Sequence, residues 1–310
     1  MTLSNGLLCI IYISEASSST CLNHITNLAK NLIGAKLVHS FKDITYNRTS
    51  FYFLGHINNP EFNKSTLQLC SEAYKLIDFN LHNGTHPALG SIDHVCFSPL
   101  VSNDDTLNIV GEFAKSFASL LSNDENIPVF TYGYANDNRL KLRDIRRNLG
   151  YFEPIILSNE SNLGPKIINS IRQNLSNNNI KPIYGDEYLD NNINFDKKGL
   201  MCIGSVPMII NYNMRFRVCD SKNLVMQVTK YCREEGIGVE ALTLQHNEGS
   251  YEVACNLTNV ENWGSDKVLK SANDKAKELG IEIVDHYTTC LLYTSPSPRD
   301  RTRSRMPSSA

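Results

Sequence analysis

Short apolar runs and amphipathic stretches follow one another along this chain, and their order restricts the folds that it can adopt. Runs such as residues 7–13 and 129–132 are typical of buried strands. Residues 65–78 place apolar side chains at helical spacing. Across residues 200–284 the expected order is strand, strand, helix, strand, strand, helix, strand. Neither GxGxxG nor GxxxxGK[ST] occurs in the sequence, so nothing predicts a nucleotide-binding fold.

The patterns predict an α+β protein (α/β two-layer) with two subdomains. We expect each to be a mixed β-sheet with helices on one face, in a split-βαβ, ferredoxin-like topology. Residues 1–198 are assigned to the first subdomain and 199–289 to the second, which we expect to be truncated. Residues 155–198 are crowded with Asn, Ser and Asp and are expected to form a long loop or linker. The basic segment 139–148 is expected to be a short surface helix.

The last part of the chain, residues 290–310, differs in composition from everything before it. It is dominated by Ser, Pro and Arg and has no periodic apolar face. It resembles translated adaptor sequence, so we interpret it as a non-native tail and leave it out of the fold. The alternative is a native disordered tail that carries a phosphorylation site.

Charge and cysteine usage limit the classes of partner. The formal net charge is -2, with 30 Lys and Arg against 32 Asp and Glu, so no basic surplus predicts nucleic-acid binding. The apolar run at residues 7–13 is too short to cross a bilayer, and no membrane partner is expected. The nine cysteines contain no CxxC pair, and no secretion signal is evident. Reduced thiols and a cytoplasmic location are therefore expected.

The densest group of polar and turn residues is the segment 81–94. Pro87 biases His86 toward an extended backbone, which places this histidine in a loop between a helix and a strand. A loop imidazole with an ordinary pKa of about 6.5 can act as a general base. The alternative is a surface histidine that only makes hydrogen bonds. His82 lies four residues before His86, but Gly84 and Pro87 prevent the helix that a zinc pair would need, and no metal site is predicted.

The sequence GTHPALGSID, residues 84–93, resembles the active-site loop of the formiminotransferase domain of formimidoyltransferase-cyclodeaminase. Further segments resemble that family in the same order and cover most of residues 7–289. The likeness is greatest to short stand-alone eukaryotic homologues without a cyclodeaminase domain. These segments are Ser14-Glu15, Tyr46–Thr49, Pro128–Gly133, Ile145–Tyr151, Asn211–Asn213 and Glu252–Leu257.

The resemblance implies a folate-binding transferase of one-carbon metabolism and histidine degradation. It would move a formimino group from formiminoglutamate to tetrahydrofolate, the co-substrate, in a tunnel between the subdomains. His86 would be the catalytic base, and a homodimer is one assembly that the resemblance allows. A solvated turn at residues 47–48 and an exposed sheet face at residues 211–213 remain alternatives to substrate contacts there. The residues expected to bind substrate are Asn47, Arg48, Asp93, Gly185, Asn211 and Asn213.

Two positions depart from the family pattern. The family has Arg after the His-Pro pair, where this chain has Ala88. The position of the family's catalytic acidic residue falls on Phe41. Asp43 comes two residues later, on the same face of a strand, and could partner His86. These departures favour the alternative of a catalytically impaired folate-binding protein with the same fold.

Overall fold

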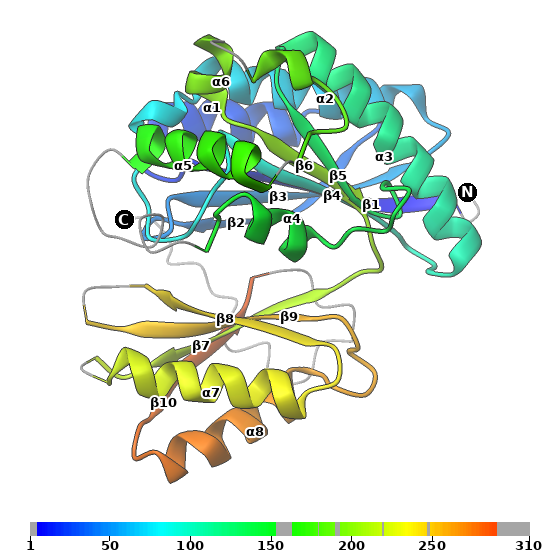
Figure 1. The fold of residues 1–310 in the computed structure, drawn as a ribbon. Helices are drawn as coiled ribbons and strands as arrows, with labels where there is room; N and C mark the ends of the chain where they lie inside the picture. The colour runs from blue at the N-terminus through cyan, green and yellow to red at the C-terminus, as the bar shows by residue number, and fades with distance from the viewer. Residues whose placement is uncertain are drawn as a thin grey trace, which may run out of the picture. The chain divides into compact units, whose positions relative to one another are not determined.

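The computed structural model describes residues 5–152, 163–178, 180–189, 193–218, 220–246 and 249–289 (Figure 1). These residues form two sheets of six and four strands. The chain divides into two compact units. The first is Met1–Met208 with Leu244–Gly249, and the second is Ile209–Thr243 with Ser250–Ala310. The α+β class with two subdomains is therefore confirmed.

The first unit is built on a mixed sheet with the strand order β2-β3-β1-β4-β6-β5. Strand β1 pairs antiparallel with β3 and β4, and β2 pairs antiparallel with β3. Strand β6 pairs parallel with both β4 and β5. The strands are β1 Gly6–Ile13, β2 Lys36–Asp43, β3 Arg48–His56, β4 Ile92–Pro99, β5 Val129–Gly133 and β6 Met201–Ser205.

Helices cover both faces of this sheet at its β5–β6 end. Met201 and Ile203 of β6 pack in one core cluster, while Cys202 between them packs in another, as the two-residue period of a strand requires. The expectation of helices on one face is therefore wrong for this unit. The first cluster takes residues from α1 Ser19–Lys30, α2 Pro60–Leu76 and α3 Asp104–Glu125, and the second from α4 Leu142–Asn148, α5 Leu163–Asn178 and α6 Ile193–Lys198.

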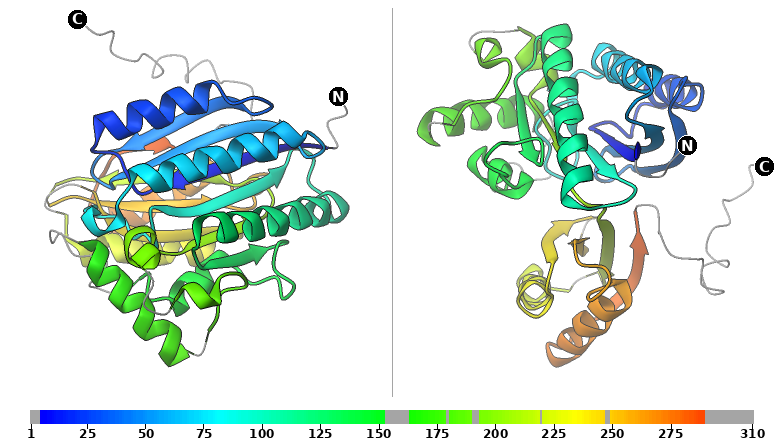
Figure 2. Two further views of the ribbon diagram at one scale, coloured as in Figure 1. Left: turned by 90° about the horizontal axis from the view of Figure 1, so that it is seen from above. Right: turned by 90° about the vertical axis from the view of Figure 1, so that its right-hand side faces the viewer.

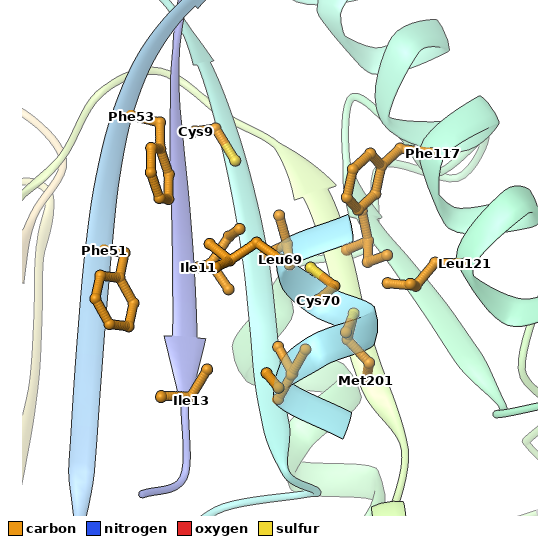
Figure 3. Packing of buried hydrophobic residues seen from close by; sticks show 14 of the residues in the cluster. Cys9, Ile11, Ile13, Phe51, Phe53, Leu69, Cys70, Phe117, Leu121 and Met201 are labelled. Carbon is orange, nitrogen blue, oxygen red and sulfur yellow. The ribbon is translucent and has the colours of Figure 1, made fainter. Parts of the chain in front are cut away.

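The larger core lies between the sheet and helices α2 and α3 (Figure 3). Alternate residues of β1 and β3 point into it, and each is at most 1% exposed. The intervening residues, including Tyr12 and Tyr52, lie on the opposite face of the same strands. Their rings meet edge to face with centroids 6.5 Å apart. The core residues of these two strands are Leu7, Cys9, Ile11, Ile13, Phe51 and Phe53, and all but Leu7 are labelled in Figure 3.

The second unit has the predicted split-βαβ topology. Its strand order is β10-β7-β9-β8, with β7 antiparallel to both β9 and β10. Both of its helices lie on the same face of the sheet (Figure 2). Its elements are β7 Ile210–Phe216, α7 Lys222–Glu235, β8 Val239–Gln245, β9 Tyr251–Leu257, α8 Ser265–Glu278 and β10 Ile283–Thr288.

Three expectations need comment here. The division falls after Met208 instead of at residue 199, because β6 belongs to the sheet of the first unit. The segment 155–198, expected to be a loop, contains helices α5 and α6. The proposed tail, residues 290–310, lies outside the described residues. Within the residues that the structure does describe, no helix is long and apolar enough to cross a membrane.

Candidate active site

The loop that carries His86 contacts three other segments of the first unit. It connects the short helix η2 (Phe79–Leu81) to β4. Thr85 N–H donates to the carbonyl of Thr45 at 3.2 Å, which ties the loop to the turn before β3. Ser14 Oγ donates to the carbonyl of Gly90 at 2.7 Å, from the end of β1. A Cβ on Gly90 would lie 2.5 Å from the carbonyl oxygen of Lys198, so the approach of the chain before β6 requires glycine here.

His86 lies between aromatic rings and beside a guanidinium group. Tyr46 meets its ring edge to face at a centroid distance of 5.2 Å. Its Nδ1 is 2.7 Å from the carbonyl oxygen of Pro87 and 3.1 Å from Arg48 Nη1. The shorter contact favours an Nδ1–H that donates to Pro87, which leaves the Nε2 lone pair available. Burial and the charge of Arg48 lower the pKa of His86 to about 3, so the imidazole is neutral at pH 7.

Two arginines converge on the buried carboxylate of Asp93. Its side chain is fully buried, and Oδ2 accepts hydrogen bonds from Arg48 Nη2 at 2.9 Å and from Arg146. Its Oδ1 accepts from the backbone N–H of Leu89 at 3.0 Å, which fixes the histidine loop to β4. Although burial favours the neutral acid, Arg146 and Arg48 hold the pKa of Asp93 well below its usual range. Asp93 is therefore charged and orients both arginines.

A second histidine, His94, completes the cluster. Its Nδ1 lies 3.0 Å from Arg146 Nη2 and 3.2 Å from Arg48 Nη2, and its ring stacks on Tyr12 at a centroid distance of 4.1 Å. Burial and the charge of Arg146 lower the pKa of His94 to about 3, so this ring is also neutral at pH 7. The cluster of Arg48, His86, Asp93, His94 and Arg146 thus carries one negative and two positive charges.

Asn47 and His82 support the loops beside this cluster. Asn47 is buried with φ 48°, and its Oδ1 accepts from Ala16 N–H at 2.7 Å. Its Nδ2 lies 3.5 Å from Nδ1 of His82, which in turn is 3.2 Å from the carbonyl of Ser14. The structure therefore gives Asn47 a role in holding the turn before β3. In the described part of the chain, no three His, Cys, Asp or Glu side chains group as metal ligands.

Asp43, the proposed partner of His86, makes its hydrogen bonds elsewhere. Its Oδ2 lies 3.1 Å from Nε2 of His246, and its Oδ1 accepts from Tyr46 N–H at 2.9 Å. His246 belongs to the short segment that clusters with the first unit. Although burial favours the neutral acid, the bonds from His246 and Tyr46 lower the pKa of Asp43. Asp43 therefore remains charged, with His246 as its imidazole partner.

Two further positions singled out in the sequence, Ala88 and Gly185, lie outside the histidine and arginine cluster. Ala88 is 2% exposed and packs in the second core cluster, so it contributes no polar group to the site. Gly185 has φ 75°, and a Cβ there would lie 2.5 Å from the carbonyl of Ile127, so its backbone position requires glycine. It lies at the start of the 3-10 helix η3 (Asp186–Tyr188), beside the residues that lead into β5.

Asn211 and Asn213 belong to the second unit, where both are hydrogen-bonded across the sheet. Asn211 Nδ2 donates to Asn256 Oδ1 at 2.6 Å. Asn213 Nδ2 donates to Glu252 Oε2 at 3.2 Å, and Glu252 is fully buried. Both asparagines lie on the same face of β7, as the alternation predicts. Their contact with a substrate stays a prediction.

Sequence reasoning missed Arg146, which was assigned to a surface helix. Its side chain is only 12% exposed, whereas Arg147 next to it is 66% exposed. The missed signal is the spacing of Leu142, Ile145 and Leu149, which marks the inner face of α4. Arg146 lies four residues after Leu142 and three before Leu149, so it points to that face.

A cavity of about 130 Å³ lies elsewhere in the first unit, along β5. Apolar side chains such as Phe130, Ile145 and Ile180 line most of it. Its described lining contains none of the predicted site residues. The chemistry of the histidine and arginine cluster identifies the candidate site better than the presence of this cavity does.

Fold and site together define an α+β protein whose first unit presents a histidine loop, hydrogen-bonded to its neighbouring segments, beside paired arginines. Residues 6–191 match the family model of the formiminotransferase domain, N-terminal subdomain. A formiminotransferase cyclodeaminase-like protein from Arabidopsis thaliana is 30% identical over 287 residues, which cover 91% of each chain. The chain therefore belongs to the formiminotransferase family, a family of transferases.

Longer relatives match over part of their length. The formimidoyltransferase-cyclodeaminase of Dictyostelium discoideum is 24% identical, and the match covers 89% of this chain and 48% of that protein. The protein of the same name from Rattus norvegicus is 30% identical over 130 residues, which cover 41% of this chain and 23% of the relative. The chain thus spans about half of the Dictyostelium relative.

Proposed function

We propose that this protein transfers a formimino group from formiminoglutamate to tetrahydrofolate, with His86 as the general base. The observation that carries the proposal is the state of His86. Its ring is neutral, its Nδ1 is engaged by Pro87, and its Nε2 has no hydrogen-bond partner among the described residues. Membership of the formiminotransferase family supports this assignment.

The chemistry requires one proton acceptor at the site of attack. A folate nitrogen forms a bond to the formimino carbon and must lose its proton, which His86 Nε2 accepts. The bond between that carbon and the glutamate nitrogen breaks, and the departing nitrogen takes up a proton. The contacts of the loop with β1 and with the turn before β3 hold the imidazole in one position, which supports the orientation that such a transfer needs.

The test is substitution of His86→Gln in the full chain. We expect the transfer rate to fall by roughly 10²–10⁴-fold, the usual contribution of a general base, with little change in tetrahydrofolate affinity. His24→Gln is the matched control, because His24 is an exposed histidine on α1 and should leave both quantities unchanged.

Two outcomes would change the assignment. Turnover by the His86→Gln protein at the parental rate would exclude His86 as the base. If the parent binds tetrahydrofolate but releases no glutamate from formiminoglutamate, the protein is a catalytically impaired folate-binding member of the family. Folate binding and glutamate release must both be measured, because Ala88 and Asp43 depart from the family pattern at the site.

A further inference from the structure

The candidate site holds more hydrogen-bond donors than acceptors. Asp93 is the carboxylate that faces Arg48 and Arg146, and its oxygens already accept bonds from both arginines and from the backbone. The two guanidinium groups are enclosed, with side chains 14% and 12% exposed. Because the neighbouring imidazoles are neutral, one positive charge in this enclosed cluster has no compensating partner within it.

Two buried groups beside this charge lack a hydrogen bond. Arg146 Nε and Tyr151 OH are inaccessible to solvent and have no partner of normal geometry in the part of the chain described. The guanidinium of Arg146 lies over the Tyr151 ring, 4.4 Å from its centroid. Burial raises the pKa of the Tyr151 hydroxyl overall, while the guanidinium groups of Arg146 and Arg48 act to lower it, so the hydroxyl oxygen faces hydrogen-bond donors. Leaving a buried polar group without a partner is costly, so such groups indicate an absent ligand.

The chemistry of the two groups identifies the kind of ligand. Arg146 Nε can only donate a hydrogen bond, and a guanidinium-facing Tyr151 hydroxyl has its proton to donate. The absent partner is therefore an acceptor. A water molecule would accept these bonds but would leave the charge uncompensated. A carboxylate supplies one negative charge and two acceptor oxygens in a plane, which matches the fork of an arginine.

We propose that Arg48, Arg146 and Tyr151 form a subsite for a carboxylate of the amino-acid donor. The inference rests on the proposed function, because a glutamate derivative is the substrate that brings carboxylates to this site. The proposed subsite explains why this chain can have Ala88 where the family has Arg. The guanidinium groups that bind the carboxylate come from β3 and α4, so an arginine at the buried position 88 is not needed.

The sharpest variant is Tyr151→Phe. Its hydroxyl proton has no acceptor among the described residues, so we expect the melting temperature to change little. Binding of L-glutamate, measured by calorimetry on the full chain, should weaken roughly tenfold, the effect of one hydrogen bond to a charged group. Tyr74→Phe is the matched control and should leave affinity unchanged, since its hydroxyl is also buried without a hydrogen-bond partner among the described residues but lies in the other core cluster.

A second variant and two amides complete the test. Arg146→Lys keeps a cation beside Asp93 but removes the fork, and should also weaken glutamate binding. Glutamine and glutamic acid α-amide each lack one carboxylate, and at least one of them should bind more weakly than glutamate. Equal affinity of the Tyr151→Phe protein and the parent, or of both amides and glutamate, would overturn the subsite. If the variants bind glutamate more weakly than the parent but the parent transfers no formimino group, the subsite stands and the proposed function is refuted.

Discussion

At the scale of single residues, the pKa of His86 connects the base to the proposed carboxylate subsite. Burial and then Arg48 lower this pKa to about 3 in the unliganded protein. A base works when it is deprotonated, so kcat/KM, which reports the free enzyme, should show no acid limb near pH 6.5. A carboxylate bound to Arg48 would offset the guanidinium charge and raise the pKa of His86 in the complex.

The expected result is an acid limb in kcat at a higher pH than any limb in kcat/KM. Rates measured between pH 5 and 8 at constant ionic strength would show the difference. The Tyr151→Phe protein, with weaker carboxylate binding, should keep the same limb in kcat once it is saturated, because Arg48 is then still occupied. A limb near pH 6.5 in kcat/KM that is lost in His86→Gln would contradict the unliganded geometry.

The same cluster shows how far single residues could be predicted. His86, Arg48 and Asp93 were predicted from short motifs, and the structure brings all three together. Arg146 lies 53 residues after Asp93, and only the placement of α4 on the sheet joins them. Asn47 has the polarity of a binding residue, but its oxygen is used by a backbone N–H. Polarity alone does not separate a residue that binds a ligand from one that supports a loop, and contact of Asn47 with a substrate stays a prediction.

At the scale of elements, α5 shows why composition misled the prediction for residues 155–198. Asn and Ser are frequent in α5, which is typical of loops. The apolar residues of the helix nevertheless form a buried stripe, and half-buried Asn174 donates a hydrogen bond to the carbonyl of Ser170 one turn earlier in the helix. Strands such as β1 and β3 were predicted within a few residues because their continuous runs of apolar and aromatic residues are typical of strands buried on both faces. The buried stripe is Leu163, Ile167, Ile168, Ile171 and Leu175.

A single truncation tests whether α5 contributes to the core. Ile171 is fully buried in the second core cluster, so Ile171→Ala should lower the free energy of unfolding by about 2–5 kcal/mol. Gln173→Ala, on the exposed face of the same helix, should have little effect because alanine is a good helix former. Urea unfolding followed by circular dichroism measures both. An unchanged free energy of unfolding in Ile171→Ala would support the loop that the sequence predicts for residues 155–198.

At the scale of the whole molecule, the buried neutral histidines give the two units different responses to acid. Burial lowers the pKa of His82 to about 4, and His86 and His94 lie at about 3. All three belong to the first unit. Between these values and the ordinary pKa of about 6.5, the unfolded chain binds more protons than the folded one. The free energy of unfolding therefore falls as the pH drops below about 6.5, by up to about 1.4 kcal/mol per pH unit for each histidine.

The fall in the free energy of unfolding of the first unit can be measured separately from that of the second unit. Trp263, the one tryptophan of the chain, lies in the second unit, so its fluorescence reports that unit while circular dichroism follows both. Between pH 7 and 5 we expect the urea midpoint from circular dichroism to fall more than the midpoint from fluorescence. His82→Phe should reduce the slope by about one proton, since a phenyl ring can keep the stack on Phe79, whose centroid is 5.1 Å away. A circular dichroism midpoint that is the same at both pH values would mean that these imidazoles are not held neutral in the folded protein.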